Sequence, residues 1–171
     1  METFVGTKPE TGELNGLSVK TITKVLKHYQ NMKKSVLFIC TNNSSRSQMA
    51  EGYLRARYGN RFEAFSAGTE ATRVHPIAIA VMREIDVDIS GQRSKLLSEF
   101  AGREMDLVVT VCVSARATCP FFPGAKETLH KEFMDPAGEK GTEEWIYPTF
   151  RNVRDRIIHW IDEYFGEEGS V

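Results

Sequence analysis

The sequence has few cysteines and no long hydrophobic run, and these absences exclude several classes of protein. Its three cysteines are an odd number without a C-x-x-C pair, which disfavours a disulfide framework and a structural zinc site. No apolar run approaches the roughly 20 residues of a membrane span, and the first residues lack the pattern of a signal peptide. We therefore expect a cytoplasmic protein with no membrane partner and no metal or other cofactor, whose cysteines are free, catalytic or redox-active.

The sequence also lacks an excess of charge of either sign. Its formal net charge is -1, so the composition gives no reason to expect nucleic acid as a partner. With 41% hydrophobic and 26% charged residues in a chain of 171, the composition is typical of a globular protein with one core. We expect one domain at residues 35–171, preceded by an extension at residues 1–34.

The N-terminal extension begins with a polar stretch and continues with a helical pattern. Apolar residues recur at near-helical spacing from Leu17 to Tyr29, which predicts an amphipathic helix. Such a helix could pack against the domain or form a contact with a partner or a second copy, and the sequence leaves both open.

The rest of the chain alternates between strand-like and helix-like segments. The predicted strands are Val36–Cys40, Phe62–Ser66, Leu107–Cys112 and Glu127–Lys131, and the predicted helices are Ser47–Tyr58, Pro76–Ile85, Leu96–Gly102 and Phe150–Phe165. A strand followed by a helix is typical of a βαβ unit, so we predict an α/β fold with a four-stranded parallel sheet and helices on both faces.

The most informative motif follows the first predicted strand. Cys40 ends an apolar run, and Arg46 follows six residues later, where a helical pattern begins. Loop N–H groups, the positive end of a helix and a guanidinium can together bind a tetrahedral oxyanion and stabilise a thiolate. We therefore predict Cys40 as a nucleophile and an oxyanion-binding loop formed by Thr41, Asn42, Asn43, Ser44, Ser45, Arg46 and Ser47.

Two further cysteines, Cys112 and Cys119, follow the third predicted strand. In a parallel sheet the carboxyl ends of the strands share one edge, so Cys112 should lie near Cys40. Cys112 and Cys119 are seven residues apart. In a helix this spacing would put the Cα atoms of Cys112 and Cys119 about 10.5 Å apart, too far for a disulfide. The pair therefore forms either a redox switch that requires unwinding or two buried structural cysteines.

Asp135 follows the last predicted strand and precedes Pro136. An aspartate in this position is either a turn residue or, beside an oxyanion site, a general acid. His28, His75, His130 and His159 show no metal-ligand spacing, and His75 is placed to cap the helix that begins at Pro76.

These segments resemble the thioredoxin-coupled arsenate reductases, which share the low-molecular-weight protein tyrosine phosphatase fold. The resemblance rests on Cys40–Glu51, Ser66–Thr69, His75–Ser90, Cys112–Pro120 and Asp135–Gly138. It implies that Cys40 attacks arsenate while Asp135 protonates the departing hydroxyl. It further implies that Cys112 attacks Cys40 to release arsenite, and that Cys119 then attacks Cys112 to form a disulfide reduced by thioredoxin or a similar dithiol. Ser47 resembles the serine that donates to the nucleophilic sulfur.

The sequence departs from this family in three places. Some members bind potassium through residues that match Asn43, Glu51 and Ser66, but a further acidic ligand is replaced by Lys95, whose ammonium we expect to take the place of the ion. Val113 replaces a residue that is usually acidic, which bears on the stability of a helix there. The N-terminal extension has no counterpart in the short members.

Two alternatives to the reductase remain. A tyrosine phosphatase of the same fold would use Cys40, Arg46 and Asp135 but neither Cys112 nor Cys119, and such phosphatases typically have a tyrosine where this chain has Ala137. A non-catalytic redox or oxyanion sensor would not need Asp135 as an acid.

Overall fold

The structure is a computed structural model that describes residues 33–112, 122–138 and 142–166, together with Thr21. The predicted helix from Leu17 to Tyr29, residue Val113 and the resolving cysteine Cys119 lie outside the described residues. The predicted boundary between the extension and the domain stays a prediction.

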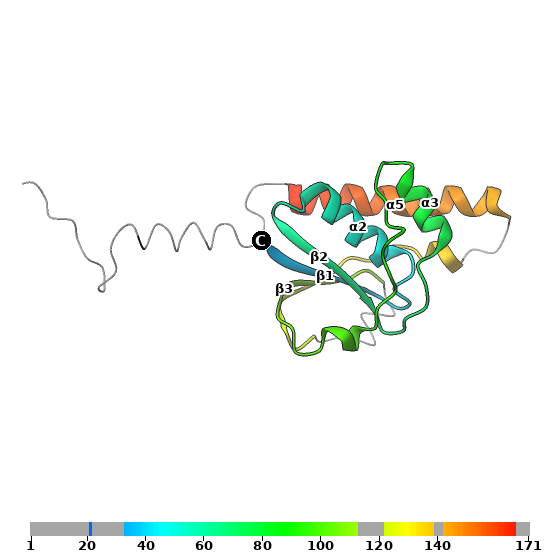
Figure 1. Cartoon of the computed structure of the whole chain (residues 1–171). Coiled ribbons are helices and arrows are strands. Elements are labelled where there is room, and N and C mark those ends of the chain that lie inside the picture. Colours follow the sequence, from blue (N-terminus) through cyan, green and yellow to red (C-terminus); the bar gives the residue numbers. More distant parts are fainter. Residues whose placement is uncertain (1–20, 22–32, 113–121, 139–141, 167–171) are drawn as a thin grey trace, which may run out of the picture. The chain divides into compact units, whose positions relative to one another are not determined.

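Four parallel strands form the sheet, as predicted. They are β1 (Lys34–Cys40), β2 (Phe62–Gly68), β3 (Met105–Thr110) and β4 (Ala125–His130). Their order is β2-β1-β3-β4, so β1 and β3 are central. Cys40 pairs in register with Gly68, which places the end of β1 beside the end of β2 at one edge of the sheet (Figure 1).

Helices cover both faces of the sheet. The α-helices are α2 (Arg46–Tyr58), α3 (Pro76–Arg83) and α5 (Glu143–Gly166), and the 3-10 helices are η1 (Leu97–Phe100) and η2 (Pro136–Gly138). In Figure 1 the three α-helices lie on one side of the strands and η1 lies on the other. The predicted α/β architecture is therefore confirmed, with one face covered by much less regular structure.

Alternation along the strands explains why the core has two halves. Phe38 of β1 packs against Trp160 and Phe165 of α5, with ring centroids 6.5 and 6.4 Å apart. Phe65 of β2 points to the opposite face and packs against Phe100 of η1 at 5.8 Å. Because both faces are covered, every residue from Val36 to Cys40 is buried, as the unbroken apolar run indicated.

Most element boundaries differ from the prediction by one or two residues, and three differences affect the interpretation. β3 ends at Thr110, so Cys112 lies two residues beyond the strand. The helix predicted at Leu96–Gly102 is one short 3-10 turn, because the backbone turns to an extended ψ of 131° at Ala101. α5 begins at Glu143 and continues through Pro148, although proline usually marks the first turn of a helix.

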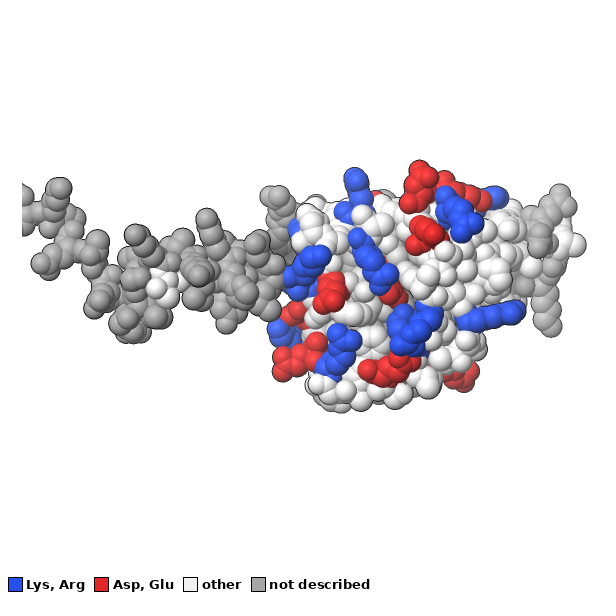
Figure 2. All heavy atoms as spheres, in the orientation of Figure 1, with Lys and Arg blue, Asp and Glu red and all other residues white. Residues whose placement is uncertain are grey.

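The surface carries charges of both signs. In Figure 2 the lysine and arginine side chains of the visible face lie among aspartate and glutamate side chains. No helix within the described residues is both long enough and apolar enough to cross a bilayer.

Candidate active site

Cys40 lies at the base of the loop that joins β1 to α2. Its side chain is buried, with 2% of the residue exposed. The Asn43 N–H points to Cys40 Sγ at 3.2 Å, and Ser47 Oγ lies 2.9 Å from the same sulfur. A thiolate at Cys40 would accept from both groups, as the resemblance implied for Ser47.

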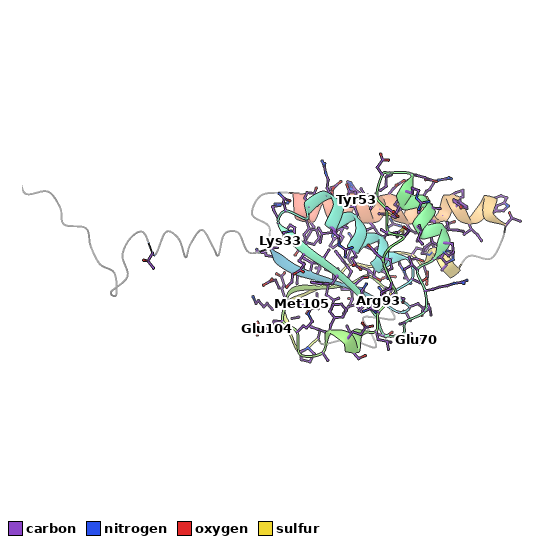
Figure 3. The ribbon with its side chains drawn as sticks, viewed as in Figure 1. Lys33, Tyr53, Glu70, Arg93, Glu104 and Met105 are labelled. Atoms are coloured by element: carbon purple, nitrogen blue, oxygen red, sulfur yellow. The ribbon has the colours of Figure 1, made fainter. Side chains whose placement is uncertain are left out.

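The carbonyl groups of residues 40–45 each accept a hydrogen bond. Backbone amides donate to four of them: Thr69 N to Cys40 O, Glu70 N to Thr41 O, His75 N to Ser44 O and Met49 N to Ser45 O, at 2.8–3.2 Å. Side chains donate to the other two: Ser94 Oγ to Asn42 O and Gln48 Nε2 to Asn43 O, both at 3.0 Å. Glu70 and Arg93, labelled in Figure 3, lie near the carboxyl ends of the strands, where this loop begins. With the carbonyls turned outward, the loop amides turn toward its centre and can bind an anion.

Asn43 fixes the tightest point of the loop. Its φ of 45° is left-handed, a conformation that asparagine tolerates better than most residues. Its Oδ1 accepts from Lys95 N at 2.7 Å and from Gln48 Nε2 at 2.9 Å. Its Nδ2 donates to Ser47 Oγ and Ser66 Oγ, each at 2.8 Å. The loop is therefore anchored to β2, α2 and residues 93–95.

A buried carboxylate, Glu51, lies beneath the loop. It accepts from Ser66 Oγ and from Arg55, and the Lys95 ammonium lies 3.1 Å from its Oε2. The same ammonium donates to Arg93 O at 3.1 Å. Because Lys95 already supplies the positive charge beside Glu51, this set of residues does not fit a bound potassium ion.

Arg46, the first residue of α2, reaches across to the loop after β4. Its Nη2 donates to Asp135 Oδ2 at 2.7 Å and its Nη1 to Phe133 O at 3.2 Å. Asp135 Oδ1 also accepts from Ala137 N at 3.1 Å, so Asp135 does form the turn expected before a proline. The turn orients the carboxylate toward Arg46, and the role of Asp135 as a general acid stays a prediction.

Cys112 lies on the same edge of the sheet, buried with 2% exposed. Its Sγ is 3.4 Å from Thr41 Oγ1, in the residue next to the predicted nucleophile. The described part of the structure thus brings together Cys40, Arg46, Asp135 and Cys112, although Cys112 lies beyond the strand rather than at its end.

A model of the low molecular weight phosphotyrosine protein phosphatase family matches residues 35–167. The chain belongs to this family. Arsenate reductases are among its relatives: it is 46% identical over 138 residues to that of Halalkalibacterium halodurans, covering 81% of this chain and 99% of the relative. It is 41% identical over 137 residues to that of Bacillus subtilis, covering 80% and 98%.

Solved structures of the family agree with this fold. An arsenate reductase in its phosphate binding state is 32% identical and covers 78% of this chain and 97% of its own, with a TM-score of 0.64. A tyrosine phosphatase of Erwinia amylovora, at 21% identity and a TM-score of 0.66 over 79% of this chain and 93% of its own, shares the fold.

Two further residues support the loop: the role of His75 was predicted from the sequence, and that of Gln48 was not. His75 caps α3 as expected, since its Nδ1 accepts from Ile77 N at 3.2 Å. Burial and the nearby Arg73 lower the pKa of His75, against an opposing effect of Asp135. Gln48 was missed, although it is fully buried and donates to Asn43 and to Arg93 O. The only signal for Gln48 in the sequence is its polar side chain two residues after Arg46.

Proposed function

We propose that this chain reduces arsenate to arsenite through a cysteine relay regenerated by thioredoxin or a similar dithiol. The observation that carries the proposal is the 3.4 Å contact between Cys112 Sγ and Thr41 Oγ1, which puts a second thiol on the oxyanion loop. Hydrolysis of a phosphate ester needs one cysteine there, whereas reduction of arsenate needs a second cysteine that forms a disulfide with the first. The names of the relatives support the same activity.

The first step forms a bond between Cys40 and arsenic. The loop amides and Arg46 hold arsenate, the Cys40 thiolate attacks the arsenic, and one arsenic–oxygen bond breaks. Asp135 gives its proton to the departing hydroxyl, which leaves as water. Arsenic is still in its higher oxidation state after this step.

The contact with Arg46 positions Asp135 for this role. Arg46 Nη2 donates to Asp135 Oδ2 at 2.7 Å. The carboxyl group proposed to donate the proton is therefore held beside the guanidinium proposed to bind the oxyanion.

The reduction occurs in the second step. The Cys112 thiolate attacks Cys40 Sγ, a disulfide forms, and the sulfur–arsenic bond breaks with its electron pair left on arsenic, which departs as arsenite. The Cys119 thiolate then attacks Cys112 Sγ and releases the Cys40 thiolate. An external dithiol reduces the Cys112–Cys119 disulfide and closes the cycle.

The second candidate is phosphotyrosine hydrolysis. Cys40, Arg46 and Asp135 form the set that this reaction needs, through a phosphocysteine that water hydrolyses. The exposed Ala137 after Asp135-Pro136 offers no ring to a phenyl group, which favours the reductase.

Turnover of arsenate with thioredoxin, thioredoxin reductase and NADPH tests the proposal. We expect repeated arsenite release, coupled to NADPH oxidation, and its complete loss in Cys40→Ser. Hydrolysis of p-nitrophenyl phosphate without arsenate turnover would establish the phosphatase instead. Activity of Cys40→Ser on either substrate would overturn the assignment of the nucleophile.

A further inference from the structure

Ser45 stands out among the residues of the oxyanion loop. The residue is only 4% exposed, and its Oγ is the one buried side-chain nitrogen or oxygen in the described part of the chain that has no hydrogen-bond partner. Leaving a buried hydroxyl unpaired is costly, so an unpaired hydroxyl within a functional loop calls for a physical explanation.

The same residue is placed where a helix cap belongs. Ser45 precedes α2, and its carbonyl accepts from Met49 N at 2.9 Å, which begins the helix. A serine in this position usually accepts from an amide of the first turn, but the Ser45 side chain makes no such bond. The Ser45 hydroxyl and the first amides of α2 therefore form no capping hydrogen bond with each other.

The Ser45 hydroxyl and these amides are all hydrogen-bond donors, so each requires an acceptor. The next residue is Arg46, a further donor, and the start of α2 contributes partial positive charge. The Cys40 sulfur is already contacted by Ser47 and the Asn43 amide. A ligand that satisfies the remaining donors must be compact, negatively charged and rich in acceptors, which describes a tetrahedral oxyanion.

We propose that the Ser45 hydroxyl donates to an oxygen of the oxyanion bound in the loop. Ser45 is then a substrate-contacting side chain and not only part of the backbone cradle. A rotation about its Cα–Cβ bond redirects the hydroxyl without moving the backbone. The inference rests on the proposed function only in requiring that an oxyanion occupies this loop, and it holds for arsenate and phosphate alike.

This role predicts opposite effects of one substitution on binding and on stability. Ser45→Ala removes a donor to a charged ligand, so affinity for inorganic phosphate should fall about 10- to 100-fold. It also removes an unpaired buried hydroxyl, so the variant without added anion should be at least as stable as the wild type. A serine with a purely structural role would lose stability when truncated.

Ser35→Ala provides the matched control at the other end of β1. Its Oγ donates to Asp106 Oδ2 and accepts from Asp106 N, both at 3.0 Å, so it is a paired hydroxyl remote from the loop. We expect this variant to lose stability and to retain the phosphate affinity of the wild type. Calorimetric titration with phosphate and urea unfolding without added anion measure the two quantities for each protein.

Three results decide the inference. Weakened phosphate binding with unchanged or higher stability in Ser45→Ala supports it. Unchanged phosphate affinity overturns it, and if the wild type still reduces arsenate, the proposed function stands without it. A shift in the pH midpoint of Cys40 alkylation at unchanged phosphate affinity also overturns it, because the hydroxyl would then serve the sulfur.

Discussion

The contact between Arg46 and Asp135 joins the residue proposed to bind the oxyanion to the residue proposed to protonate its departing hydroxyl. The arginine side chain is 10% exposed and the aspartate 46%, so the guanidinium is enclosed while the carboxylate reaches solvent. If Asp135 is the general acid proposed above, it should contribute to the rate more than to binding.

Asp135→Asn should lower kcat for arsenate by about 10²–10⁴-fold, because an amide cannot protonate the departing hydroxyl. KM should change much less, because Arg46 and the loop amides remain. Steady-state kinetics measure both values, with Glu63→Gln, an exposed carboxylate elsewhere on β2, as the control. An unchanged kcat would show that Asp135 only forms the turn before Pro136.

Lys95 should make the site indifferent to potassium. Its ammonium is 3.1 Å from Glu51 Oε2 and repels a second cation. Stability and kcat/KM in potassium and sodium salts of equal ionic strength should be nearly equal. Lys95→Gln should lose about 1.5–3 kcal/mol of unfolding free energy in sodium, because Glu51 loses a charged donor, and should recover part of it in potassium. A large potassium effect on the wild type would contradict this expectation.

At the scale of elements, the start of α3 gives the protein a pH-dependent cap. His75 accepts from Ile77 N through Nδ1, and only an unprotonated Nδ1 can accept. The pKa of His75 is lowered from 6.5, so the native state binds fewer protons than the unfolded chain just below that pH. The stability that this cap contributes is complete above pH 6.5 and is lost as the pH falls.

His75→Asn should weaken the pH dependence of stability in this range, because asparagine caps a helix without titrating. Urea unfolding at pH 7.5 and pH 5.5 should show a smaller loss for the variant than for the wild type. His159→Asn, which removes an exposed histidine of α5, controls for the loss of an imidazole away from the cap. Equal losses in His75→Asn and the wild type would show that the cap does not titrate in this range.

The sequence predicted the sheet well because each strand carries its own signal. The buried run from Val36 to Cys40 follows from coverage of both faces, and that coverage was readable as continuous hydrophobicity. Helix ends were less predictable: the chain around Phe100 contains enough apolar residues for a helix, but only one 3-10 turn forms before Gly102. Pro148 similarly concealed the first turns of α5.

The oxyanion loop was predictable where its chemistry is local. Cys40 and Arg46 lie six residues apart, and their positions at the end of β1 and the start of α2 follow from one strand, one turn and one helix. The supports of the loop were not predictable, because Ser94 reaches Asn42 O from 52 positions away. An ordinary serine carries no sign of such a contact. The pairing of Arg46 with Asp135, separated by 89 positions, likewise required the fold.

At the scale of the whole molecule, the proposed relay requires three cysteines to act in order. Cys119→Ser should release about one arsenite per protein and then stop as a Cys40–Cys112 disulfide, because nothing remains to attack Cys112. Cys112→Ser should stop before arsenite leaves, with Cys40 still able to hydrolyse a phosphate ester. Arsenite quantification, thiol counting and peptide mapping after one turnover distinguish these states. Sustained thioredoxin-driven turnover of Cys119→Ser would contradict the relay.

The outward-held carbonyls of the oxyanion loop also bear on how this protein can evolve. Four of the six carbonyls accept from backbone amides, at Thr69, Glu70, His75 and Met49. Every residue except proline carries such an amide, so substitutions at Thr69 and Glu70, which are not buried, can alter the outer surface while the amides that hold the carbonyls remain. Descendants of this chain can thus acquire new specificity around an unchanged loop, and we expect selection to keep proline out of positions 69 and 70.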